Sequence, residues 1–103
     1  MNLLEMHCKA MNLPAPVLEY KFHPKRRWKI DAAWPGFRLA VEIEGGLYGR
    51  GRHVSIKGYK GDLDKYNALA LMGWRLLRFL PEQVKSGLAV RTIEEYFIER
   101  RKE

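Results

Sequence analysis

The chain has 103 residues, 47% of them hydrophobic and 12% aromatic, which leaves room for one core and no second domain. Lys and Arg number 19 against 12 Asp and Glu, and a net charge of +7 is typical of a protein that meets a polyanion. This composition excludes a disordered or fibrous chain, and no apolar run approaches the roughly 20 residues of a membrane span. We therefore expect one domain over residues 1–103 and no membrane partner.

Cys8 is the single cysteine, so an internal disulfide cannot form, and no Cys/His spacing resembles a zinc site. The N-terminal segment is interrupted by Glu5, His7 and Lys9, unlike a signal peptide. Both features favour a reducing compartment, and we expect a cytoplasmic protein.

The first half of the chain predicts a helix followed by three strands. Apolar residues at helical spacing after Asn2, a capping residue, predict a helix over about residues 3–12. Alternation with a period of two predicts strands at 17–22, 27–34 and 37–44, separated by turns that contain proline.

Alternation also assigns faces on the second strand. We expect Trp28, Ile30 and Ala32 to point inward together and Lys29 and Asp31 to point outward.

The second half predicts a basic loop, a helix, a strand and further helical turns. Gly, Arg and Lys dominate residues 47–58, which predicts a mobile loop. Apolar residues recur at helical spacing from Tyr59 until Gly73, residues 74–80 form a short fourth strand, and Pro81 opens the C-terminal helical part. Because a helix separates strands three and four, these two can pair in parallel within an otherwise antiparallel sheet.

Two glutamates, Glu42 and Glu44, lie on either side of Ile43 in the third strand. Residues two apart on a strand point to the same side, about 7 Å apart, and Asp31 lies beside them if the neighbouring strands pair. Converging acids repel one another, so they persist where a positive group is shared, commonly Mg²⁺ or Mn²⁺. Such an ion can activate a water that attacks a phosphodiester, and the pattern therefore indicates a nuclease. The alternative is an exposed strand face whose acids pair with basic residues across the strands.

The composite of these motifs resembles a known superfamily. The order of elements, an Asp on the second strand and "EIE" on the third are similar to the core of the PD-(D/E)XK nucleases. More closely, "EYKFHPKRRWKIDAAWP", "LAVEIEGG", "GRH" and "DLDKYNALALMGWRLLRF" resemble small bacterial and phage endonuclease-like proteins near the DUF559 and very-short-patch-repair branch, over about residues 19–79. The resemblance implies an α/β fold with an αβββαβ restriction-endonuclease-like core, a four-stranded mixed sheet flanked by helices, and a C-terminal helix.

The resemblance also implies metal ligands. Asp31 matches the metal-binding Asp of the superfamily, Glu42 matches the second ligand, and the Ile43 carbonyl is a third. Glu44 stands where the superfamily pattern has a lysine that orients or deprotonates the attacking water. Glu44 is therefore either a third metal ligand or the base itself, or a lysine from elsewhere acts instead.

Three further residues are candidates for the catalytic chemistry. Lys29 lies two residues before Asp31 and so on the same strand face, which makes it the first replacement for the missing lysine, and Lys65 is the next. His53, in the matching "GRH", suits proton transfer to the leaving oxygen, although a loop histidine is most often simply solvated.

Positive charge is concentrated in the first hairpin and in the glycine-rich loop, on both sides of the acids. Arg and Lys on loops bind phosphates without reading sequence, so we expect DNA binding directed by the backbone or by structure, at nicks, flaps or branches. If both strands are cut, a symmetric homodimer brings two sites together. The expected nucleic-acid-binding residues are Arg26, Arg27, Arg50, Arg52, Lys57 and Lys60.

The sequence and the resemblance together predict a metal-dependent endonuclease that hydrolyses DNA phosphodiester bonds. One alternative is a noncatalytic nucleic-acid-binding or assembly module that keeps a nuclease fold, motivated by the missing lysine. Cleavage of RNA instead of DNA is a second alternative, and the sequence does not decide between the two polymers because it shows no reader of the 2′-hydroxyl. Only the resemblance implies a role in DNA repair or recombination in a bacterial or phage-infected cell.

Overall fold

The computed structural model of the protein describes residues 2–44 and 56–101, and for residues 56–59 the backbone alone. The elements are, in chain order, α1 (Leu3–Ala10), β1 (Val17–Lys21), β2 (Lys29–Trp34), a 3₁₀ turn η1 (Pro35–Phe37), β3 (Leu39–Ile43), α3 (Ile56–Leu71), β4 (Arg75–Phe79), α4 (Pro81–Lys85) and α5 (Leu88–Arg101). Within these ranges no helix is long and apolar enough to cross a membrane.

The four strands form one mixed sheet in the order β1-β2-β3-β4. β1 pairs with β2 and β2 with β3 in antiparallel fashion, whereas β3 and β4 are parallel. The expected parallel pair is thus confirmed, and α3 lies on the connection that a parallel pair requires. The coarse class, an α/β fold with a four-stranded mixed sheet flanked by helices, is confirmed as well.

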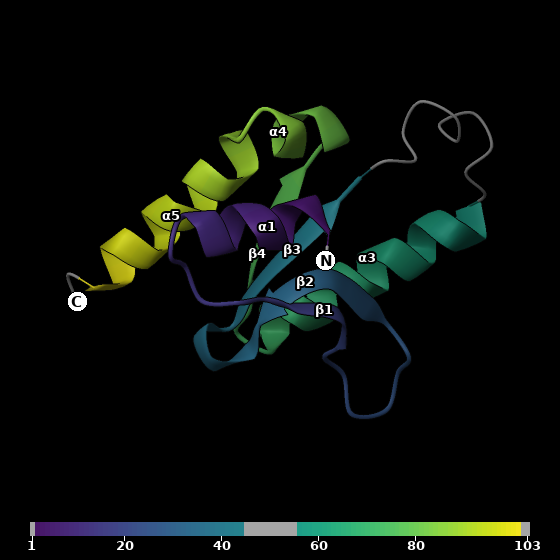
Figure 1. The fold of residues 1–103 in the computed structure, drawn as a ribbon. Helices are drawn as coiled ribbons and strands as arrows, with labels where there is room; N and C mark the ends of the chain where they lie inside the picture. The colour runs from purple at the N-terminus through teal and green to yellow at the C-terminus, as the bar shows by residue number, and fades with distance from the viewer. Residues whose placement is uncertain (1, 45–55, 102–103) are drawn as a thin grey trace.

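Helices cover both faces of the sheet (Figure 1). On one face α1, α4 and α5 pack through Leu4, Val84 and Ile93 against Trp34 and Val41 of the strands. This is the larger of the two cores, and it also buries the free thiol of Cys8.

The second face is covered by α3. Leu69 of α3 packs with Trp74, Ile30, Ala33 and Ala40 in a separate buried cluster. Ile30 therefore belongs to this cluster, while its strand neighbour Ala32 belongs to the other. The expectation that Ile30 and Ala32 share one inward face was wrong, because the alternation of faces is interrupted between these two residues, at the point where Glu19 on the paired strand β1 has a φ of +52°.

The start of α3 also differs from expectation. The helix begins at Ile56 and not at Tyr59, so Lys57 lies in a helix and not in a loop. The first turn of this helix contains Gly58, and this glycine beside Lys57 gave the segment the pattern of a loop.

α1 begins as the sequence predicts. The Asn2 side chain accepts a hydrogen bond from the backbone N–H of Glu5 at 2.9 Å, and the Glu5 carboxylate accepts one from the backbone N–H of Asn2 at 2.9 Å. This reciprocal capping box occupies two backbone donors at the start of the helix.

Candidate functional site

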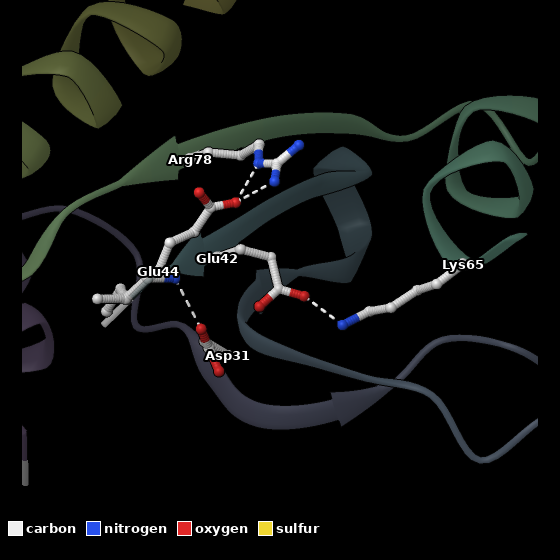
Figure 2. Close-up of polar contacts among 6 residues, drawn as sticks. Asp31, Glu42, Glu44, Lys65 and Arg78 are labelled. Carbon is white, nitrogen blue, oxygen red and sulfur yellow. Dashed lines mark hydrogen bonds and ion pairs between the residues drawn. The ribbon is translucent and has the colours of Figure 1, made fainter. Parts of the chain in front are cut away.

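Asp31 lies on β2 and is bonded directly to the neighbouring strand. Its Oδ2 accepts a hydrogen bond from the backbone N–H of Ile43 at 2.7 Å. The antiparallel register of β2 and β3, in which Ala32 lies opposite Val41, brings Asp31 to the level of Glu42. Backbone pairing therefore fixes the Asp31 carboxylate beside Glu42 (Figure 2).

Glu42 is the centre of the site. It is 7% exposed and is the one buried charged residue among those described. Lys65 of α3 donates a hydrogen bond to Glu42 Oε1 and forms an ion pair with it (Figure 2). α3 thus supplies the countercharge to an acid that the sheet holds out of water.

The pKa of Glu42 is raised to about 7. Burial is the main cause, since removal from water disfavours the charged form. The neighbouring Asp31 carboxyl raises the pKa of Glu42 further through hydrogen bonding and charge, while Lys65 lowers it. The Asp31 carboxyl is therefore close enough to oppose the ionisation of Glu42.

Glu44 bonds elsewhere. Its carboxylate accepts a hydrogen bond from Nε of Arg78 on β4 and forms an ion pair with the same guanidinium (Figure 2). The Arg78 guanidinium also lies over the ring of Tyr66, 4.6 Å from its centroid. Burial, followed by the charge of Glu42, raises the pKa of Tyr66 to about 12, so this phenol stays neutral at physiological pH.

The structure therefore brings together two of the three expected carboxylates, Asp31 and Glu42, and pairs the third, Glu44, with Arg78. Within residues 2–44 and 56–101 there is no group of three or more His, Cys, Asp or Glu side chains that could hold a metal ion. Ile43 contacts the site through its backbone N–H, which bonds Asp31.

The two candidate lysines occupy different positions. Lys65 reaches from α3 to Glu42. Lys29 is exposed at the start of β2, where it lies opposite Lys21 of β1. The geometry therefore gives Lys65 the direct contact with a site carboxylate.

The donor set fits a hard divalent cation in kind, because carboxylate oxygens are what Mg²⁺ and Mn²⁺ prefer. Asp31 and Glu42 offer such oxygens side by side, and a shared cation would offset both the burial and the Asp31 repulsion that raise the pKa of Glu42. Lys65 partly relieves the same repulsion through its bond to Glu42 Oε1.

Several expected residues lie away from this centre or outside the description. Arg26 and Arg27 are exposed in the turn between β1 and β2, and Lys60 is exposed on α3. Lys57 lies on α3, where only the backbone is described. His53, Arg50 and Arg52 lie outside the described residues.

Sequence reasoning missed Arg78 as part of the site. The parallel register places it opposite Glu42 on β4. The signal in the sequence is a basic residue inside the otherwise apolar run "LLRFL", and in the structure its half-exposed side chain lies beside Glu44.

Comparison with known proteins gives a limited result. The chain is 29% identical over 75 residues to two proteins of Mycobacterium tuberculosis, called Uncharacterized protein Rv2248 (strain ATCC 25618 / H37Rv) and Uncharacterized protein MT2308 (strain CDC 1551 / Oshkosh). The match covers 71% of this chain and 26% of each relative, so the chain spans about a quarter of their length. No family model and no solved structure matches the chain.

Proposed function

We propose that this domain is a metal-dependent endonuclease that hydrolyses DNA phosphodiester bonds, built on a PD-(D/E)XK nuclease core. The observation that carries the proposal is the Asp31 and Glu42 pair, held side by side on adjacent strands with Lys65 bonded to Glu42. A mixed sheet with a helical crossover before β4 and an Asp on β2 supports the same family. The net charge of +7 suits a polyanionic substrate.

Each side chain has a distinct task in this proposal. Asp31 and Glu42 hold Mg²⁺ or Mn²⁺, which when bound polarises the phosphodiester and lowers the pKa of water. The bond from Ile43 N–H orients the Asp31 carboxylate, and Lys65 both orients Glu42 and offers positive charge to a phosphate oxygen. Arg78 keeps the charge of Glu44 balanced at the rim.

The test is nicking of supercoiled plasmid in Mg²⁺, in Mn²⁺ and in EDTA, with Asp31→Asn as the variant. We expect metal-dependent nicking by the wild type and a loss of at least about 100-fold in Asp31→Asn, since a ligand is removed. DNA binding by the variant stays equal or tightens, because one negative charge near phosphate is lost. Nicking by Asp31→Asn at the wild-type rate would refute the proposal.

Lys65 and Lys29 form a matched pair in the same assay. At saturating DNA, where weaker binding no longer limits the rate, Lys65→Met is expected to slow nicking by at least about tenfold because a positioned group is lost, whereas Lys29→Met changes the saturated rate little. The reverse ranking would assign the working lysine to β2.

A second function is favoured by a different observation. Lys65 and Arg78 already balance Glu42 and Glu44 by direct ion pairs, which suits a noncatalytic nucleic-acid-binding module on the same fold. This second function predicts DNA binding without nicking and no heat on titration with Mn²⁺.

A labelled RNA placed in the nicking assay tests whether the protein cleaves RNA.

A further inference from the structure

The turn between β1 and β2 gathers exposed positive charge. Five side chains there are exposed, and we call them the basic turn: Lys21, Lys25, Arg26, Arg27 and Lys29. In the described part of the chain none of them forms an ion pair. The strand register also puts Lys21 directly opposite Lys29, an arrangement of like charges that is destabilising unless an anion lies between them.

Side-chain contacts hold this turn in shape. Nδ1 of His23 accepts hydrogen bonds from the backbone N–H groups of Lys25 at 3.1 Å and Arg26 at 3.0 Å. The Trp28 ring stacks on Phe22, with centroids 6.1 Å apart and an interplanar angle of 16°. Because Phe22 is buried in the cluster under α3, the turn is anchored to the core and its charges are preorganised.

Arg26 occupies a special position in the turn. Its guanidinium lies over the Trp28 ring, 4.7 Å from the centroid, while the residue remains exposed. A guanidinium stacked on an indole is fixed in its plane, and its N–H edge stays available to two oxygens of one phosphate. A lysine at the same position offers charge without this planar fork.

We propose that the basic turn is a preformed binding surface for the phosphate backbone of a nucleic acid, with Arg26 stacked on Trp28 as its anchor. The choice of nucleic acid among polyanions rests on the proposed function. Lys29 and Asp31 are two residues apart on β2, so the basic turn continues the strand that carries the site (Figure 1). A backbone held at the turn therefore runs toward Asp31 and Glu42.

The test is the affinity of the full chain for a fluorescein-labelled DNA duplex in EDTA, measured over a range of salt concentrations. Arg26→Ala is expected to bind about tenfold more weakly and to lower the slope of log affinity against log salt by about one. Arg26→Lys is expected to keep the wild-type slope but bind severalfold more weakly, because the planar fork is lost. The control is Lys85→Ala, which removes an exposed charge on α4 and should bind like the wild type.

Three outcomes would overturn the inference. Equal DNA affinity of Arg26→Lys and wild type would show that Arg26 is not the anchor. Unchanged affinity of Arg26→Ala would show that the basic turn is not part of the interface. Phosphatidylserine vesicles serve as a second probe, and Arg26-dependent binding to them without DNA binding also overturns it. Because EDTA prevents metal-dependent cleavage, failure of the nuclease proposal appears separately, as intact DNA binding without nicking in metal.

Discussion

At the scale of single residues, Glu42 is the least expected feature, because a charged side chain is buried there. A carboxylate 7% exposed on a central strand is unfavourable unless a cation compensates it. Lys65 supplies part of that compensation, because its bond to Glu42 favours the charged carboxylate. A buried acid retained at such a cost is typical of a functional site.

The raised pKa of Glu42 predicts a pH dependence of stability. A carboxyl group titrates near 4.3 when unfolded and near 7 here, so between these values the folded state retains a proton that the unfolded state has lost. This contribution favours folding at low pH and disappears as pH rises through 7. In metal-free buffer, Glu42→Gln should gain about 2–3 kcal/mol of unfolding free energy relative to wild type between pH 5 and 8.

Urea unfolding of both proteins at the two pH values measures this difference. Parallel changes in wild type and variant would show that Glu42 titrates near its ordinary value. Lys65→Met is the companion variant. Loss of the ion pair should raise the pKa of Glu42 further, so this variant should lose more unfolding free energy between pH 5 and 8 than the wild type does.

Cys8 offers a second prediction at this scale. Its thiol is fully buried, and burial, followed by the charge of Glu5, raises its pKa to about 11. Because the thiolate is the reactive form, we expect labelling by a disulfide reagent at pH 8 to be slow in the native protein and rapid in urea. Rapid labelling without denaturant would contradict the packing of α1 against the sheet.

At the scale of elements, the capping box of α1 can be tested by substitution. Asn2→Ala removes the side-chain acceptor for the N–H of Glu5 and should lower the free energy of unfolding by about 1 kcal/mol. Asn67→Ala, at an exposed position within α3, is the control and should not destabilise, because alanine is the better helix former. Equal effects in chemical denaturation would mean that the cap contributes nothing.

Substitution of two glycines, one within α3 and one directly after it, should have opposite effects on stability. Gly73 ends the helix with φ of +82°, so Gly73→Ala should destabilise by about 1–2 kcal/mol through backbone strain alone. Gly61 lies inside α3, and a Cβ there meets nothing within 4 Å, so Gly61→Ala should stabilise by up to about 1 kcal/mol. Thermal unfolding of the two variants should move in opposite directions, and a shift in the same direction would contradict the assigned helix end.

The elements were largely predictable because their signals are local. Asn2 and Glu5 predicted the start of α1, and alternation with a period of two predicted the first three strands. The separation of Ile30 from Ala32 was not predictable in this way, because it follows from a backbone irregularity between them, opposite Glu19 with its φ of +52°, which no polar or apolar pattern reports.

At the scale of the whole molecule, contacts between elements that are close in the sequence were predictable, and contacts between distant elements were not. Asp31 and Glu42 were expected to meet because β2 and β3 are consecutive and antiparallel. The pairing of Arg78 with Glu44 depends on the parallel register of β3 and β4, which are separated by α3. That register is set by how Leu69 and its neighbours pack on the sheet, a long-range property with no local pattern.

The whole molecule also explains how a basic protein tolerates a buried glutamate beside a second acid. The sheet fixes Asp31 and Glu42 from two adjacent strands, and α3 brings Lys65 over them from the covered face. The basic turn at the end of β2 carries charge of the opposite sign. In the proposed function, a cation and a phosphate complete this arrangement of charges.

The most direct measurement of the site is calorimetric titration of the metal-free protein with Mn²⁺, comparing wild type, Asp31→Asn and Lys29→Met. The proposed site predicts saturable heat for wild type and Lys29→Met and its loss in Asp31→Asn, with the variant confirmed as folded by circular dichroism. Equal saturable heat in Asp31→Asn, or none in the wild type, would contradict a cation site at Asp31 and Glu42.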